Sequence, residues 1–145
     1  MMAGTLVAFD FGARRVGVAV GETGTGIASP LTTIAAEANE ARFAAIEKIV
    51  AEWQPAGFVV GRPRHSDGSP HEVARLAEKF ARRLAARFKR PVAFVDETLT
   101  SAIAESELAL HRTRASRKGD IDALAAAMIL QSFLDDPAAH EHLGS

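Results

Sequence analysis

Short apolar runs separated by glycine fill the first third of the chain. Leu6–Phe11 and Val16–Val20 are two such runs, and the connection Gly12–Arg15 between them is short. A short connection that begins with a turn residue predicts an antiparallel hairpin. Ile27–Ile34 is predicted to be a third strand, and it is expected near a sheet edge because Pro30 has no backbone N–H to donate.

From Glu40 onward, the spacing of apolar residues becomes helical. The apolar stripe consists of Phe43, Ile46, Val50 and Trp53. Charged residues lie between them and form the predicted polar face: Glu40, Arg42, Glu47, Lys48 and Glu52. This pattern predicts an amphipathic helix over residues 40–53, which ends before Pro55.

The second half of the chain alternates short β-branched runs with helical patterns. The predicted elements are a strand at 58–60, a helix at 71–88, a strand at 92–95, a helix at 100–110 and a final helix that begins at Asp120 or Asp122. The final helix is apolar nearly all round from Ala123 to Leu130, which is typical of a buried helix. A hairpin followed by alternating strands and helices predicts an α/β fold, in which helices cover both faces of a mixed sheet. We expect one domain at residues 1–137 and a loose C-terminal tail at 138–145.

Composition narrows the class of protein. The chain has 145 residues, no cysteine and a net charge of −1, so disulfides and thiolate metal sites are excluded. Residues 1–11 hold no basic leader, and Asp10 interrupts their apolar run. We therefore expect no signal peptide and no membrane anchor. The five histidines form no metal-binding pattern and are expected on the surface.

Positive charge is concentrated in two predicted loops. One loop contains Arg62 and Arg64, and the other contains Arg112, Arg114, Arg117 and Lys118 without an intervening acid. Such loops hold a polyanion such as a nucleic-acid backbone, or they are simply solvated. The sequence leaves both interpretations open.

Asp10 lies inside a stretch otherwise suited to a core strand. An ionised carboxylate taken out of water is unfavourable without a partner, so Asp10 needs a metal, a ligand or a neighbouring cation. A structural alternative is that Asp10 pairs with Arg14 or Arg15, or caps the turn before Gly12.

Two further acidic pairs occur at element boundaries. Asp96 and Glu97 directly follow the predicted strand at 92–95, and ligands gather beyond the carboxyl ends of parallel strands. Asp120 and Asp122 precede the final helix, where either one can serve as an N-cap. Asp96 can likewise cap the helix after it. The residues alone do not decide which member of each pair has a chemical role.

Together these acids suggest a metal site. Carboxylates from a strand, a strand end and a helix start can converge on one or two hard divalent cations, Mg²⁺ or Mn²⁺ in its place. Two such ions about 3.5–4 Å apart stabilise the attacking and leaving oxygens of a phosphodiester displacement. The basic segment 112–118 leads directly into the third acidic pair, which would place phosphate contacts beside the metals.

Several short motifs follow one another along the chain: Leu6–Gly12, Val16–Gly21, Val59–Pro63 with Asp67–Gly68, Asp96–Thr100 and Lys118–Ala123. In this order, from about Leu6 to Leu134, they resemble the YqgF family of bacterial Holliday-junction-resolvase-like proteins, also described as nucleases of pre-16S rRNA. The resemblance implies an RNase H-like fold and a magnesium-dependent endonuclease that matures ribosomal RNA in the cytoplasm.

Position by position, the resemblance places the catalytic and metal-binding acids at Asp10, Glu97 and Asp122, rather than at Asp96 and Asp120. It implies that the protein binds structured RNA, that it acts as a monomer or homodimer, and that it does not contact a membrane. The expected substrate contacts are Arg62, Arg112, Arg114, Arg117 and Lys118. Two positions depart from the family pattern: Thr98 stands where arginine is frequent, and Arg62 where an apolar residue is commoner.

Four functions are compatible with these residues. The first is an RNA endonuclease that processes the 5′ end of pre-16S rRNA, and the second is a DNA junction resolvase, which would need a symmetric dimer. A third is a nucleic-acid-binding factor of the ribosome or transcription machinery with little or no catalysis. A fourth, a phosphate-binding ATPase of the actin type, requires two such domains, and this chain has room for one.

Overall fold

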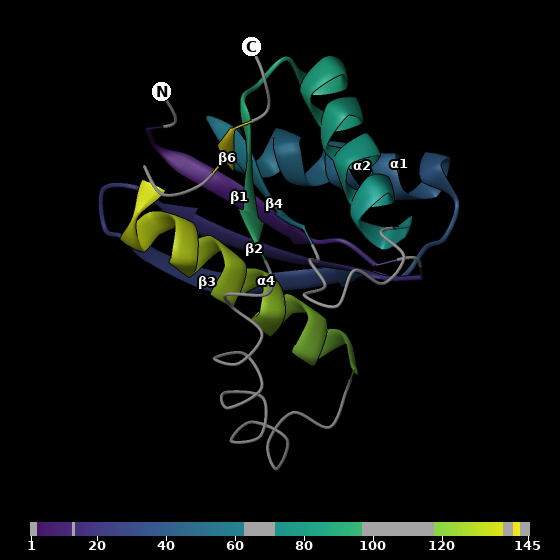
Figure 1. Cartoon of the computed structure of the whole chain (residues 1–145), viewed down its shortest axis with the longest axis horizontal. Coiled ribbons are helices and arrows are strands. Elements are labelled where there is room, and N and C mark those ends of the chain that lie inside the picture. Colours follow the sequence, from purple (N-terminus) through teal and green to yellow (C-terminus); the bar gives the residue numbers. More distant parts are fainter. Residues whose placement is uncertain (1–2, 13, 63–71, 97–117, 138–140, 143–145) are drawn as a thin grey trace.

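The computed structural model describes residues 3–12, 14–62, 72–96, 118–137 and 141–142 (Figure 1). Its centre is a six-stranded sheet in the order β3-β2-β1-β4-β5-β6. The strands β1 (Thr5–Asp10), β2 (Val16–Glu22) and β3 (Ile27–Ile34) are antiparallel neighbours, whereas β4 (Gly57–Arg62) and β5 (Val92–Asp96) run parallel to β1. This mixed sheet, opened by a hairpin, confirms the predicted fold class. β3 lies at the sheet edge, as its proline predicted.

Helices cover both faces of the sheet. α1 (Asn39–Trp53) and α2 (Glu72–Phe88) pack on one face, and α4 (Lys118–Asp135) packs on the other (Figure 1). The helix expected at 100–110 lies outside the described residues. Within the described ranges, no helix is long and apolar enough to cross a bilayer.

The C-terminal segment expected to be a loose tail contributes to the sheet. Glu141 and His142 form the short strand β6, which pairs antiparallel with Phe94 and Ala93 of β5. The ring of His142 also lies 5.9 Å from that of Phe133 on α4. Part of this tail is therefore ordered against the domain, which corrects the expectation for residues 141–142.

The two faces of the sheet carry different side chains. The face under α1 and α2 carries the large strand residues Phe9, Phe58 and Phe94, together with Val7 and Val60. The face under α4 carries the small strand residues Ala8, Ala19 and Ala93, together with Val59 and Val95. Successive strand residues point to opposite faces, so this division follows directly from the alternation of large and small residues along β1, β4 and β5.

Two expectations for α1 were wrong. Arg42, assigned to the polar face, is only 3% exposed, whereas Trp53, assigned to the apolar stripe, is 37% exposed. Arg42 precedes Ile46 by four residues and Ile49 by seven, so helical geometry places all three on the buried side. α1 ends where Gln54 adopts a left-handed conformation and donates its N–H to the carbonyl of Val50 at 2.8 Å.

α4 begins at Lys118, earlier than expected, so neither Asp120 nor Asp122 is its N-cap. Its sheet-facing residues are buried, but Leu124 and Met128 on the outer side are only half-buried, which corrects the expectation of a helix buried all round. The helix is also fastened to the β2–β3 turn, because the Gln131 side chain donates to Gly26 O at 2.8 Å and accepts from Ala28 N at 3.0 Å.

Candidate active site at the strand ends

Asp10 is the last residue of β1 and is half-buried. Leu6 and Ala8 belong to the cluster under α4, so the two-residue period of the strand places Asp10 on that same face. Its Cα is in register with Gly17 of β2 on one side and Gly61 of β4 on the other. The carboxylate is therefore flanked by two residues that have no side chain.

Gly17 brings the start of α4 against the sheet beside Asp10. A Cβ added at Gly17 would lie 2.0 Å from the backbone oxygen of Asp122, and 3.1 Å from the nitrogen of Ala123. No larger residue fits there without moving the helix. Because paired residues on antiparallel strands have Cα atoms about 4.5–5.5 Å apart, Asp122 lies close to Asp10 although 112 positions separate them along the chain.

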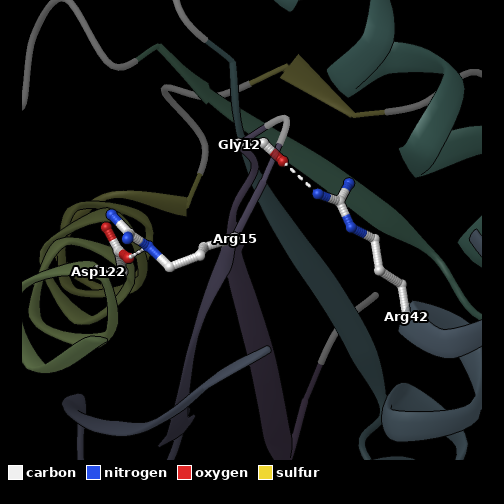
Figure 2. A network of polar contacts seen from close by, with 4 residues as sticks. All are labelled: Gly12, Arg15, Arg42 and Asp122. Carbon is white, nitrogen blue, oxygen red and sulfur yellow. Dashed lines mark hydrogen bonds and ion pairs between the residues drawn. The ribbon is translucent and has the colours of Figure 1, made fainter. Parts of the chain in front are cut away.

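The carboxylate of Asp122 is held by a cation from the β1–β2 turn. Arg15 Nε donates to Asp122 Oδ2 at 2.6 Å. Figure 2 shows the two side chains facing each other. The two side chains are 40% and 24% exposed, so solvent screens the pair and its contribution to stability is small. The sequence suggested Arg14 or Arg15 as a partner of Asp10; the structure shows Arg15 paired with the third acid.

A second arginine anchors the same turn from the opposite side of the sheet. Arg42 Nη2 donates to Gly12 O at 2.8 Å (Figure 2), Nε donates to Ala36 O, and the guanidinium lies 5.3 Å from the Phe11 ring centroid. Burial lowers the pKa of Arg42 from its usual value, and the charge of Glu37 opposes that shift. An arginine side chain nevertheless stays protonated. Arg42 therefore donates to two backbone carbonyls, one in the β1–β2 turn and one in the segment before α1.

The carboxyl end of β5 lies at the same end of the sheet as Asp10. Asp10 is in register with Gly61, Gly61 with Val95, and Arg62 with Asp96. Adjacent strands are about 4.8 Å apart, so the Cα of Val95 lies about 10 Å from that of Asp10. Glu97 and Thr98 lie outside the described residues.

The expected substrate contacts fall in several places. Arg62, at the end of β4, places its guanidinium 4.9 Å from the ring centroid of Phe94, which belongs to the core under α1 and α2. Arg62 thus lies on the face opposite Asp122. Lys118 begins α4, and Arg112, Arg114 and Arg117 lie outside the described part of the chain.

The described donors suit a hard cation, although they do not form a complete site. No group of three or more His, Cys, Asp or Glu residues within the described ranges is placed to hold a metal ion. Asp10 and Asp122 offer only carboxylate oxygens, the ligands that Mg²⁺ prefers. The Asp122 carboxylate is paired with the Arg15 guanidinium, so a metal ion bound there would share this carboxylate with Arg15.

The sequence interpretation did not identify Gly17 or Arg42 as contributors to this edge. Gly17 lies in a strand in which Gly17, Ala19 and Gly21 alternate with valines, and such a pattern indicates close approach of another backbone. The burial of Arg42 was detectable, because Arg42 lies four residues before Ile46 and therefore on the same side of the helix. The pairing of Arg15 with Asp122 joins residues 107 positions apart and has no local signal.

The fold and the candidate site define the class of protein. It is an α/β domain of RNase H-like type, with one carboxylate at the carboxyl end of β1 and another near the start of α4. Comparison with known proteins specifies it further. The family model RuvX, described as Holliday junction resolvase, matches residues 4–136. This chain belongs to that family, which confirms the resemblance found in the sequence motifs.

Curated relatives span nearly the same length. A protein of Dechloromonas aromatica is 58% identical over 92% of both chains, and one of Thiobacillus denitrificans is 56% identical over 91% of this chain and 92% of its own. Both are named "Putative pre-16S rRNA nuclease". Among solved structures, Thermus thermophilus RuvC in complex with a Holliday junction substrate matches with a TM-score of 0.60 and 15% identity, over 97% of this chain and 99% of that one. This likeness supports the fold.

Proposed function

We propose that this protein is a metal-dependent endonuclease that hydrolyses phosphodiester bonds in structured RNA, in the 5′-end processing of pre-16S rRNA in the cytoplasm. The names of its relatives support the substrate. One observation supports the chemistry: the backbone of Asp122 packs on Gly17, the register partner of Asp10. The carboxylates of Asp10 and Asp122, which are far apart along the chain, therefore lie on the same face of the sheet, at the carboxyl end of β1.

Glu97 is the third acid of this proposal. Glu97 directly follows β5, whose carboxyl end lies at the same end of the sheet as Asp10. The family resemblance assigns the third acid to Glu97 rather than to Asp96.

Asp10, Glu97 and Asp122 would hold Mg²⁺, or Mn²⁺ in its place. When bound, such an ion supplies Lewis acidity and positive charge at the reacting phosphate. Gly17 allows the close approach of α4 to the sheet beside Asp10, and Arg15 pairs with the Asp122 carboxylate that the ion would share. Cations at the same edge would bind the neighbouring phosphates, and we propose Arg62, Arg112, Arg114, Arg117 and Lys118 for this role.

The decisive test is Asp10→Asn, which keeps the size of the side chain and removes its charge. We expect Mg²⁺-dependent cleavage of a pre-16S rRNA 5′-leader substrate to fall at least about a thousandfold, while circular dichroism and thermal unfolding stay close to wild type. The matched control is Asp136→Asn, an exposed carboxylate that follows α4, for which cleavage should not change. Full cleavage by Asp10→Asn would end the metal-site mechanism.

The description of the matching family favours a second candidate, cleavage of four-way DNA junctions. The same carboxylates would act, but two cuts on one junction require two copies of the chain. Cleavage of the RNA leader and of a four-way DNA junction, measured side by side at equal enzyme concentration, separates the two. Preference for the DNA junction by a dimeric species would replace RNA as the substrate.

A further inference from the structure

The structure buries one charge that the proposed mechanism does not use. Among the described residues, Arg42 is the one charged side chain that is buried, at 3% exposed. It lies on α1, across the sheet from α4 and Asp122. Burying a guanidinium costs free energy that an apolar residue at the same helix position would not, unless its hydrogen bonds offset the cost. The packing of α1 therefore does not require an arginine here.

The contacts of Arg42 fall on the two residues that follow Asp10. Arg42 Nη2 donates to Gly12 O at 2.8 Å, and the guanidinium lies 5.3 Å from the ring centroid of Phe11. The Phe11 ring also packs 5.2 Å from that of Phe80 on α2. Because successive strand residues point to opposite faces, Phe11 faces α1 and α2 while Asp10 faces α4. The chain directly after Asp10 is thus held from the far face of the sheet.

Asp10 stands where the ladder of β1 ends. Its partners there are Gly17 of β2 and Gly61 of β4, and neither has a side chain with which to orient the Asp10 carboxylate. The backbone at this strand end sets where the Asp10 side chain leaves the sheet. Beyond the ladder, the hydrogen bond from Arg42 to Gly12 O holds that backbone two residues after Asp10.

The same turn carries Arg15, the partner of Asp122. A Cβ added at Gly12 would lie 2.6 Å from Arg15 O, so the chain folds back closely at Gly12. Figure 2 shows Arg15 reaching Asp122 on one side of the hairpin and Arg42 reaching Gly12 from the other. Loss of the Arg15–Asp122 pair alone would free a carboxylate for an ion, whereas a displaced Asp10 would weaken the proposed metal site. The two effects have opposite signs, so a measurement of ion affinity tells them apart.

We propose that Arg42 is a positioning residue of this metal site, which holds the β1–β2 turn at Gly12 O and so fixes the direction of the Asp10 carboxylate on the opposite face. Arg42 would touch neither the ion nor the substrate. Its planar guanidinium suits the task, because its nitrogens donate in fixed directions to Gly12 O and to Ala36 O. The inference rests on the proposed function for the presence of an ion. Its own basis is the set of contacts with the residues after Asp10.

The first test measures Mn²⁺ affinity by electron paramagnetic resonance, in variants shown to be folded by circular dichroism. Arg42→Met keeps an unbranched side chain and removes its donors, and we expect the Kd for Mn²⁺ to rise about five- to tenfold. Arg42→Lys keeps the charge but not the planar donor group. Its Kd should also rise, by a smaller factor, and it carries the comparison where Arg42→Met does not fold. The matched control is Ile49→Ala, at a buried residue about 10 Å further along α1, for which Kd should stay at the wild-type value.

The second test is amide hydrogen exchange, followed by nuclear magnetic resonance without any divalent ion. Thr23 N donates to Gly4 O, and because every second pair of antiparallel strands is bonded, the amides of Ala8 and Asp10 both donate to β2. We expect Arg42→Met to speed exchange of the Asp10 amide about tenfold relative to that of Ala8, because only the strand end loses its anchor. The control should leave this ratio unchanged.

Unchanged Mn²⁺ affinity in both Arg42 variants, or an equal loss in the control, would overturn Arg42 as a positioning residue. Tighter binding would overturn it too, because the Arg15–Asp122 pair rather than Asp10 would then be responding. Exchange that speeds equally along β1 would reduce Arg42 to a general contribution to stability. The proposed function has its own test: if Asp10→Asn binds Mn²⁺ as tightly as wild type, the metal site fails whatever the Arg42 variants show.

Discussion

The two faces of the sheet pack their helices in opposite ways. Under α1 and α2 the core consists of interlocking rings, with Phe80 5.4 Å from Phe9 and 5.7 Å from Phe43. Under α4 the strand backbone itself meets the helix, because Gly17 has no side chain. The aromatic face buries large side chains and stabilises the domain, whereas the small-residue face gives up buried area to bring a second carboxylate to Asp10.

Among the described residues, an ion pair of the same length lies on each side of the sheet. Arg15–Asp122 and Arg87–Glu47 are both 2.6 Å, and all four side chains are substantially solvated. Only the first involves a proposed metal ligand. Because the two pairs have the same length, breaking each in turn separates the general effect of losing an ion pair from an effect specific to the candidate metal site.

The largest effect on stability is expected from Phe80→Ala. Phe80 is 4% exposed and contacts three other rings, so its removal leaves a cavity in the aromatic core. We expect the free energy of unfolding, measured by urea denaturation, to fall by about 3–5 kcal/mol. Ile27→Ala, at a side chain 62% exposed, should cost less than about 1 kcal/mol. A loss below about 1 kcal/mol for Phe80→Ala would mean that the aromatic face does not dominate stability.

Gly17→Ala should have a smaller effect on stability and a larger one on the site. The new methyl group would meet the Asp122 backbone, so the start of α4 must move away from Asp10. We expect a loss of about 1–3 kcal/mol in unfolding free energy, and loss of Mg²⁺-dependent cleavage even where the variant is fully folded.

Two other glycines of the same region calibrate that result. A Cβ at Gly21 would meet Ile27 O at 2.9 Å and the ends of the Leu130 and Leu134 side chains at 3.0 and 3.1 Å, and one at Gly24 would meet nothing within 4 Å. The loss of stability on substitution by alanine should therefore decrease from Gly17 through Gly21 to Gly24. Wild-type cleavage by Gly17→Ala would show that close approach of α4 is not needed for activity.

Most of the sheet could be predicted because its signals are local. The hairpin, the edge position of β3 and the apolar runs of β4 and β5 each follow from a few consecutive residues. Arg42 could not be placed by its residue type, because charged side chains seldom lie in a core unless backbone acceptors surround them. Those acceptors, Gly12 O and Ala36 O, belong to segments that meet α1 only in the folded chain.

For the candidate site, the sequence indicates residue types more than connections. A carboxylate in a core strand is a signal in itself, so Asp10 could be named as a candidate. The partner of Asp122 was not, because an ion pair across the fold depends on how closely α4 approaches β2. That approach is set by a glycine in one strand and by a helix that starts a hundred residues later.

The smallest effect on stability, and the sharpest comparison of the two faces, is expected from Arg15→Gln. Loss of this solvated ion pair should change the unfolding free energy by less than about 1 kcal/mol. Because Arg15 and a divalent ion would share the Asp122 carboxylate, we expect Mn²⁺, titrated by electron paramagnetic resonance, to bind about two- to fivefold more tightly. Arg87→Gln, which breaks the pair on the aromatic face, should leave Mn²⁺ affinity unchanged. Equal or weaker Mn²⁺ binding in Arg15→Gln would mean that Arg15 does not compete for this carboxylate.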